Sequence, residues 1–229
     1  MIILSDLSEV HIRGIRGTER FIAEKFAVSS VGKKGLADKC WRRHAAVNGA
    51  FRDLLRGRIS EDEYWQEFFA KGQWLFTIDD AKEALSKNLQ EVMPHAATGV
   101  LQRIIRYPRS LSPDGFGYAD GMPTVYLVSD HIANRINEVK AAHPGLFRLF
   151  KDEYWSCDAG MIKQDPGFFA AVLDDAGLNP DEVLYIDDDA KNIAAASREG
   201  IHGIKFENDR QLETVMRSNY GFEFAPEVP

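Results

Sequence analysis

This 229-residue sequence has only two cysteines, no long apolar run and no excess of basic residues. Its two cysteines, Cys40 and Cys157, have no Cys-x-x-Cys spacing and do not indicate a disulfide framework. No apolar stretch approaches the ~18 residues that span a bilayer, so we expect no membrane partner. The N-terminus has no basic segment, and Asp6 comes too early for a signal peptide. These absences predict a cytoplasmic protein.

The charge balance argues against a nucleic-acid partner. The 28 lysines and arginines are outnumbered by 35 aspartates and glutamates, which gives a net charge of −7. Basic residues cluster at 33–34, 42–43 and 52–58, but solvated helix faces account for such clusters. With 45% hydrophobic and 28% charged residues, the composition is that of an ordinary globular protein. The length suits one large domain or a domain with an insertion.

Two short acidic segments are the most informative feature that is present. Residues 2–6 and 183–187 are apolar runs of strand length, and each stops at an aspartate, Asp6 and Asp187, the latter followed by Asp188. In a parallel sheet, ligands bind beyond the carboxyl ends of the strands. Carboxylates held close together repel one another unless a cation lies between them. Mg²⁺ takes oxygen ligands and keeps water and phosphate in its shell, so the pattern predicts a magnesium site.

The order of elements predicts an α/β protein with a doubly wound parallel sheet. Apolar segments of strand length alternate with helical patterns through the second half of the chain. The predicted strands are 2–6, 124–128, 153–156, 183–186 and 203–206, and the predicted helices between them are 132–142, 166–176 and 193–199.

A helical block lies between the first strand and the rest of the sheet. We predict helices at 18–26, 37–55, 61–69, 78–89 and 94–106, a loop at 107–123 and an irregular tail from 220. Ser60 and Glu63 have the spacing of a capping box. The aromatic stripe that follows at 64–69 is more typical of helix-packing core than of a substrate wall. The predicted domains are an α/β core of residues 1–16 and 95–229 and an inserted helical cap of residues 17–94.

Four motifs in this order resemble the haloacid dehalogenase-like (HAD) hydrolase superfamily, over nearly the whole chain. They are Ile3-Leu4-Ser5-Asp6-Leu7-Ser8, Leu127-Val128-Ser129, Lys163-Gln164-Asp165-Pro166 and the pair Asp187-Asp188. The resemblance implies a Rossmann-like core with a helical cap, similar to small bacterial sugar-phosphate phosphatases. It implies a Mg²⁺-dependent phosphatase acting on a small phosphorylated metabolite, possibly a sugar phosphate.

The resemblance also implies roles for the motif residues. Asp6 would be the nucleophile and form an aspartyl-phosphate. Asp6, the Ser8 backbone carbonyl and Asp187 would hold Mg²⁺, and Asp188 would complete the shell of the metal or its waters. The phosphate would be bound by Ser8, Ser129, Asp130 and Lys163, with Lys163 supplying positive charge and Ser129 a hydrogen bond.

Position 8 departs from the family pattern. Many family phosphatases carry an aspartate there that protonates the leaving group, and general acid catalysis contributes roughly 10²–10⁴-fold. Ser8 is a poor acid, and Glu9 and His11 are the nearest replacements. Gln164 stands where proline is common, which changes a loop and leaves the charge of Lys163 unaltered.

The sequence also allows interpretations in which these residues have no role in a site. Asp6 could be a turn residue, Ser129 a helix N-cap and Lys163 a solvated lysine, and Asp187 with Asp188 could cap the next helix. We expect Asp189 to be a surface or capping residue and His11 to be satisfied or exposed, whereas His131 has a better chance of reaching the site.

Two other functions also fit the sequence. A catalytically weak regulatory protein would keep the Mg²⁺ and phosphate pocket, and Ser8 supports that alternative. A metal-free 2-haloacid dehalogenase would gain nothing from three clustered carboxylates. The sequence leaves the oligomeric state open. We expect the cap residues that face the site to be among the aromatic ones, namely Trp41, Tyr64, Trp65, Phe68, Phe69 and Trp74.

Overall fold

The central sheet brings together the strand ends that the sequence singled out. The computed structural model describes residues 1–91, 97–106 and 123–225. Five parallel strands lie in the order β4-β3-β1-β5-β6. The strands are β1 (Ile2–Ser5), β3 (Thr124–Ser129), β4 (Glu153–Trp155), β5 (Val183–Asp187) and β6 (His202–Lys205). Ser5 pairs with Leu127 of β3 and with Ile186 of β5, so the carboxyl ends of these three strands are level.

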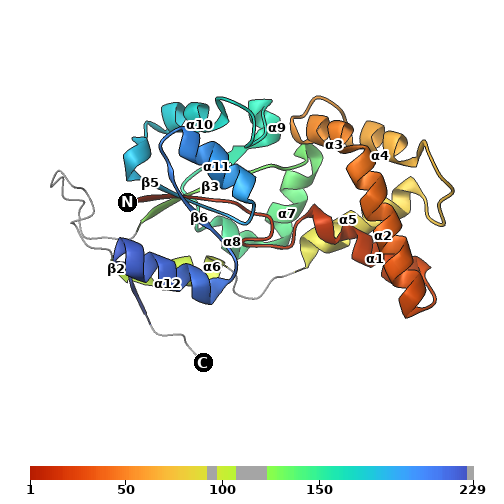
Figure 1. Cartoon of the computed structure of the whole chain (residues 1–229), viewed down its shortest axis with the longest axis horizontal. Helices are drawn as coiled ribbons and strands as arrows, with labels where there is room; N and C mark the ends of the chain where they lie inside the picture. Colours follow the sequence, from red (N-terminus) through yellow and green to blue (C-terminus); the bar gives the residue numbers. More distant parts are fainter. Residues whose placement is uncertain (92–96, 107–122, 226–229) are drawn as a thin grey trace.

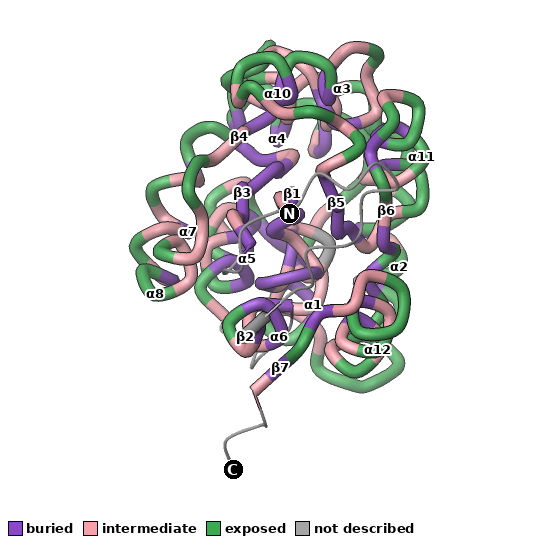
Figure 2. Tube along the Cα trace, turned by 90° about the vertical axis from the view of Figure 1, so that its left-hand side faces the viewer, coloured by how far each residue is buried: buried purple, intermediate pink, exposed green. Residues whose placement is uncertain are grey.

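Helices cover both faces of this sheet (Figure 1). On one face, α10 (Phe168–Ala176) and α11 (Ala190–Arg198) pack against Leu4, Tyr126 and Tyr185. On the other face, Ile3, Val125 and Leu184 pack against side chains of α6 (Ala97–Gln102) and α12 (Asp209–Tyr220). Alternate residues of each strand therefore enter opposite cores, as the strand period of two requires. The strands are mostly buried (Figure 2), and the predicted doubly wound α/β fold is confirmed.

Shorter elements complete the α/β part. They are η2 (Ala133–Arg135), α7 (Ile136–Ala142), α8 (Pro144–Phe147), α9 (Ser156–Ala159) and η3 (Pro180–Glu182). Side chains of α7 and α8 pack with Leu7, Leu127 and Trp155 into a smaller apolar cluster.

Five helices form a separate group to one side of the sheet, on the right in Figure 1. We call residues 18–90 the helical segment. The turn η1 (Ile15–Gly17) precedes this segment. The segment contains α1 (Thr18–Phe26), α2 (Ser30–Ala46), α3 (Asn48–Leu55), α4 (Glu61–Phe69) and α5 (Ile78–Gln90). Its side chains form their own apolar cluster, which includes Tyr64, Trp65 and Phe68. The aromatic stripe of α4 is thus packing core, as expected. The capping box of Ser60 and Glu63 is also confirmed.

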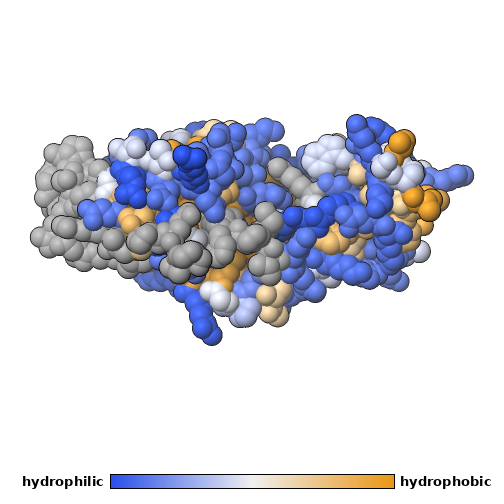
Figure 3. Space-filling view, turned by 90° about the horizontal axis from the view of Figure 1, so that it is seen from below, coloured by the Kyte–Doolittle hydropathy of each residue, from blue (hydrophilic) through white to orange (hydrophobic). Residues whose placement is uncertain are grey.

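The surface of the helical segment carries the large hydrophobic side chains that are exposed in the described part of the chain. They are Val28, Val31, Trp41 and Leu75. Seen from below, hydrophobic residues gather at the right-hand end of the molecule, and hydrophilic residues predominate among the other coloured residues (Figure 3). No helix in the described residues is both long enough and apolar enough to cross a membrane.

Two predicted helices differ from the structure. The helix predicted at 37–55 is two helices, because the chain leaves helical geometry at Val47, with φ −109° and ψ 24°. The helix predicted at 94–106 ends at Gln102, and β2 (Ile104–Arg106) pairs antiparallel with β7 (Glu223–Phe224). The tail is therefore not irregular at 223–224, because Phe222 and Phe224 enter the core beside α12. The loop predicted at 107–123 lies outside the described residues except for its last position.

Candidate active site

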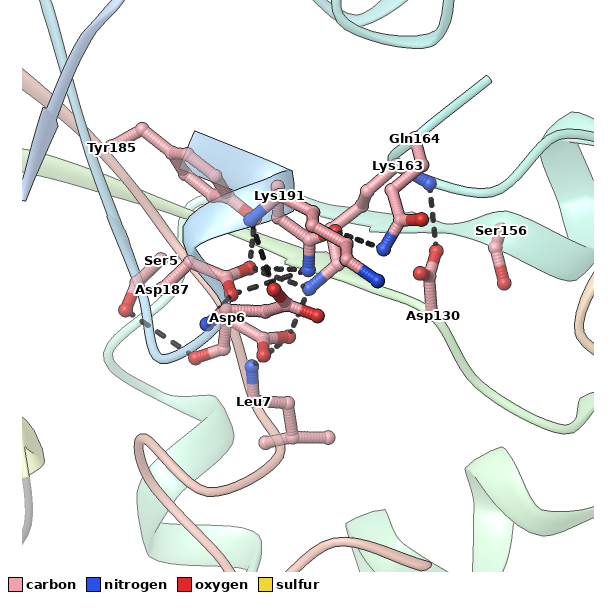
Figure 4. A network of polar contacts seen from close by, with 12 residues as sticks. Ser5, Asp6, Leu7, Asp130, Ser156, Lys163, Gln164, Tyr185, Asp187 and Lys191 are labelled. Atoms are coloured by element: carbon pink, nitrogen blue, oxygen red, sulfur yellow. Dashed lines mark hydrogen bonds and ion pairs between the residues drawn. The ribbon is translucent and has the colours of Figure 1, made fainter. Parts of the chain in front are cut away.

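The carboxyl edge of the sheet holds a cluster of three carboxylates, of which Figure 4 labels Asp6 and Asp187. Asp6 follows β1, Asp187 ends β5, and Asp188 comes next. One oxygen from each lies within 4.8 Å of the others. The backbone N–H of Asp6 donates to the Ile186 carbonyl at 2.9 Å, which continues the β1–β5 pairing up to the cluster. The predicted convergence of these two strand ends therefore occurs in the structure.

Lys163 enters this cluster from the loop between α9 and α10. Its side chain is 2% exposed, and Nζ lies 2.7 Å from Asp6 Oδ1 and 2.8 Å from Asp187 Oδ2. Burial alone would lower the pKa of Lys163, but the carboxylates of Asp187, Asp6 and Asp130 raise it overall. The lysine is therefore a fixed positive charge and not the solvated loop residue that was one alternative.

The three carboxylates of the cluster act on one another. Burial raises the pKa of Asp6 well above its usual range, Lys163 opposes the rise, and Asp187 and Asp188 add to it. A bound divalent cation would reduce the repulsion between carboxylates that lie this close together. Hard oxygen donors of this kind suit Mg²⁺. The donor set thus fits the predicted metal.

Asp187 and Asp188 have different surroundings. Asp187 is fully buried, and it accepts hydrogen bonds from Lys163 Nζ, from the Tyr185 hydroxyl, from the Asp189 backbone N–H at 2.7 Å and from Asn192 Nδ2 at 3.1 and 3.2 Å. These donors use the acceptor capacity of both carboxylate oxygens. Asp188 lies beside Asp187 and lines the pocket above the cluster. Sequence reasoning missed Tyr185 and Asn192.

The end of β3 contributes a serine and an aspartate with different partners. Ser129 is fully buried, and its Oγ has no hydrogen-bond partner among the described residues. It caps no helix, so that alternative is wrong. Asp130 lines the pocket, and its Oδ1 accepts the backbone N–H of Lys163 at 2.9 Å. The aspartate thereby ties the lysine loop to β3.

The loop after β1 presents Ser8 and Glu9 to the same pocket. Glu9 has φ 62°, a left-handed conformation that is uncommon outside glycine, and its Oε1 accepts the Gly14 N–H at 2.8 Å. A Cβ on Gly14 would lie 2.9 Å from Ser8 Cβ, so the close return of the loop needs glycine. Of the two candidate acids, Glu9 lines the pocket.

His11 does not line the pocket. Its ring nitrogens lie 2.9 Å from Ser5 Oγ and 2.6 Å from Thr98 Oγ1, and burial lowers its pKa to about 3. It is the satisfied histidine that was expected. His131 does line the pocket, and its ring stacks on Trp155. Asp189 caps α11 by accepting the Lys191 N–H at 2.9 Å, which confirms the capping interpretation.

The pocket has a volume of about 270 Å³ and lies between the sheet edge and the helical segment. The expectation that the site faces one of the aromatic residues Trp41, Tyr64, Trp65, Phe68, Phe69 and Trp74 is wrong. None of the six residues in question lines this pocket, because the α4 aromatics pack inside the segment and Trp41 borders a smaller cavity there. The segment contributes instead Asn48, Phe51, Arg52, Leu55, Leu85 and Leu89.

Helix α3 is bound directly to the lysine loop. Arg56 makes a bidentate pair with Asp165, two residues after Lys163, with Nε–Oδ2 at 2.7 Å and Nη2–Oδ1 at 2.6 Å. The Ser156 hydroxyl donates to the Leu55 carbonyl at 2.6 Å. Bidentate pairs fix orientation as well as distance. The pocket wall and the loop that carries Lys163 are therefore held by one set of contacts.

The chain belongs to the haloacid dehalogenase-like hydrolase family, whose model matches residues 2–200. It is 30% identical over 174 residues to flavin mononucleotide hydrolase 1 of Arabidopsis thaliana, a match that covers 70% of this chain and 58% of that protein. It is 26% identical over 174 residues to drimenol cyclase drtB of Aspergillus calidoustus, covering 72% and 31% respectively. The chain thus matches less than two thirds of the length of either relative.

Solved structures share the fold. A HAD family enzyme of Bacteroides thetaiotaomicron, solved in complex with magnesium and inorganic phosphate, matches with a TM-score of 0.61 and 22% identity over 90% of this chain and 93% of that one. The L-2-haloacid dehalogenase of Xanthobacter autotrophicus matches with a TM-score of 0.57 and 16% identity, over 89% and 76%. At these identities the likeness concerns the fold alone.

Proposed function

We propose that this protein is a Mg²⁺-dependent phosphatase that hydrolyses a small phosphorylated metabolite through an aspartyl-phosphate on Asp6. The observation that carries the proposal is the cluster of Asp6, Asp187 and Asp188 around the buried Lys163 ammonium. The hydrolase family, a relative named as a flavin mononucleotide hydrolase and a fold neighbour solved with magnesium and phosphate support it.

The residues that we expect to contact the metal directly differ in one position from the sequence prediction. Asp6, Asp188 and the Ser8 backbone carbonyl would hold Mg²⁺, because the oxygens of Asp187 already accept hydrogen bonds from Lys163, Tyr185, Asn192 and a backbone N–H. When bound, the ion would supply positive charge to the nucleophile and the phosphate. Asp187 then holds Lys163 in place and does not contact the metal directly.

The chain's own residues account for both chemical steps. The Asp6 carboxylate attacks phosphorus, the bond from phosphorus to the ester oxygen breaks, and the alkoxide leaves with the electron pair. Lys163 balances charge on Asp6 and on a phosphoryl oxygen, and Ser129 Oγ donates a hydrogen bond to another. Water then attacks the phosphorus of the aspartyl-phosphate, which releases inorganic phosphate and restores Asp6.

Protonation of the leaving group has no dedicated acid at position 8 of this chain. Ser8 lines the pocket where many family members have an acid, and Glu9 is the carboxyl group beside it. We infer slow turnover of esters with poor leaving groups. We further propose that residues 17–94 act as a cap over a core of residues 1–16 and 95–229.

The chemistry separates this proposal from the metal-free dehalogenase. A dehalogenase of this fold would need Asp6 to attack carbon with no cation present. Three carboxylates held this close together repel one another when no cation is bound, and that reaction makes no use of them. The phosphatase uses the same cluster to bind a cation.

Hydrolysis of p-nitrophenyl phosphate tests the proposal. Nitrophenolate leaves without an acid, so Ser8 does not limit the assay. We expect phosphate release that requires Mg²⁺, stops in EDTA and is lost in Asp6→Asn. Asp174→Asn, at an exposed position on α10, is the control and should keep full activity. Mg²⁺-dependent phosphate binding without turnover would instead favour a regulatory binding protein.

A further inference from the structure

One face of α3 forms a wall of the pocket. Asn48, Phe51, Arg52 and Leu55 occupy positions i, i+3, i+4 and i+7 of this helix, and all four line the pocket. Residues at this spacing lie on one side of a helix. Helix α3 therefore presents four side chains to the pocket along one stripe, and they carry an amide, an aromatic ring, a guanidinium and an isobutyl group.

The guanidinium of Arg52 makes a longer ion pair with Asp165 than its neighbour Arg56 does. Arg56 occupies both oxygens of Asp165 at 2.6 and 2.7 Å, whereas Arg52 Nη2 lies 3.6 Å from Asp165 Oδ1, beyond hydrogen-bond distance. Arg56 and Arg58 also share Asp53, at 3.3 and 3.6 Å. Three arginines thus face two carboxylates, and the side chain of Arg52 stays 36% exposed at the pocket wall.

Apolar side chains make up a large part of the pocket lining. Phe51 and Leu55 of α3 and residues of α5 and of neighbouring loops line the same pocket as Arg52. The apolar lining residues are Ile15, Phe51, Leu55, Leu85, Leu89, Ile132 and Ile162. A polyhydroxylated sugar would leave hydroxyl groups against these side chains without partners, at a cost for each. An apolar ring or chain would bury its surface there favourably.

We propose that Arg52 determines specificity, and that the substrate is a phosphomonoester whose leaving group combines an apolar ring or chain with a second anionic group. This inference rests on the phosphatase function proposed above and adds the substrate class. The anion is a carboxylate or a second phosphate, since a guanidinium binds both through paired N–H groups. Phe51 packs on the apolar part, and Asn48 adds amide hydrogen bonds.

Four synthetic esters test the proposal. They are 4-carboxyphenyl phosphate, its neutral analogue 4-carbamoylphenyl phosphate, 1,4-phenylene bisphosphate and p-nitrophenyl phosphate. We expect the wild type to have a kcat/KM about 10–100-fold higher for the carboxylate than for the amide, mainly through KM. In Arg52→Gln the ratio should fall to near 1, and Arg52→Lys should keep part of it. Because the ratio of kcat/KM for the carboxylate to that for the amide is compared between wild type and variant, the different intrinsic reactivities of the two leaving groups cancel.

Matched controls separate this inference from the phosphatase function. Arg58→Gln removes an arginine from the same cluster that is 58% exposed and outside the pocket lining, and it should leave the ratio unchanged. An equal ratio in wild type and Arg52→Gln, with both enzymes turning over the amide, overturns the inference and leaves the phosphatase intact. Failure of the wild type on all four esters removes both proposals. A preference for the bisphosphate that Arg52→Gln abolishes identifies the anion as a phosphate.

Discussion

At the scale of single residues, the two adjacent aspartates at the end of β5 have separate tasks. Asp187 is saturated with donors and holds Lys163, whereas Asp188 faces the pocket. We expect Asp188→Asn to lose most of the Mg²⁺-dependent activity while the free energy of unfolding changes by less than about 1 kcal/mol. Asp187→Asn should destabilise the protein by roughly 3–5 kcal/mol, because it leaves a buried ammonium short of a partner. Urea unfolding and Mg²⁺ titration of both variants measure the contrast.

The opposite pattern would contradict this assignment. An Asp187→Asn variant of normal stability that no longer responds to Mg²⁺ would make Asp187 the direct metal ligand, as the sequence had suggested. Tyr185→Phe is a useful companion, since it removes one hydrogen-bond donor to Asp187 and keeps the ring that packs on Phe169.

Position 8 allows a gain of function to be tested. Ser8→Asp places a carboxyl group at the pocket wall where a leaving group needs a proton. We expect kcat for an alkyl phosphate to rise by about 10²-fold or more, within the usual range for general acid catalysis, while p-nitrophenyl phosphate changes little. Ser8→Asn, of the same size without the acid, is the control. Equal rates in the two variants on the alkyl ester would mean that this position does not reach the leaving group.

The sequence was most predictive for residues whose chemistry coincides with an element boundary. Asp6 and Asp187 stand at strand ends, and the parallel order of strands brings them together for geometric reasons. The sequence analysis missed Tyr185, although its position was informative. Side chains two residues apart on a strand point to the same side, so Tyr185 and Asp187 share a face of β5. Asn192 carried no such signal, because its contact with Asp187 depends on how α11 packs against β5.

At the scale of elements, the contact between α3 and the lysine loop connects the pocket wall to the carboxylate cluster. We expect a double-mutant cycle of Arg56→Ala and Asp165→Ala to give a coupling energy of about 1–2 kcal/mol, reduced from a fully buried pair because both side chains are partly exposed. The cycle is measured by urea unfolding. Lys25 and Glu83, at 2.8 Å but 43% and 48% exposed, form the control pair and should couple by less than about 0.5 kcal/mol. Equal coupling in the two pairs would contradict a specific tie.

Helix boundaries decided which residues of the helical segment were recognised as pocket residues. A single helix over 37–55 gives one continuous face, and its apolar positions predict packing core alone. The chain leaves helical geometry at Val47, so α3 starts anew and directs Phe51 and Arg52 toward the pocket. Likewise, Ile104 has an apolar pattern that suits either a helix or a strand, and its pairing with β7 depends on residues more than one hundred positions away.

At the scale of the whole molecule, buried ionisable groups join parts of the chain that are distant in sequence. His11 contacts Ser5 of β1 and Thr98 of α6, and it is held neutral in the core. Asp130 is also buried, but burial raises its pKa, so the folded chain binds that proton more readily than the unfolded chain. These two groups therefore shift stability in opposite directions as the pH falls, and only a difference between variants isolates one of them.

Acid should weaken the fold through His11. Its pKa is about 3 in the folded chain and roughly 6.5 when unfolded, so between these values the unfolded chain binds the extra proton. The free energy of unfolding must then fall as the pH drops below about 6.5, by up to about 1.4 kcal/mol per pH unit from this group. Urea unfolding of wild type and His11→Gln from pH 7 to pH 4.5 should show a shallower decline in the variant. His202→Gln, at an exposed position on β6, should follow the wild type. A parallel decline in the free energy of unfolding of His11→Gln and wild type would contradict this prediction. It would mean that the folded protein protonates His11 as readily as the unfolded chain does, and two contacts with hydroxyl groups in an apolar core do not stabilise an imidazolium.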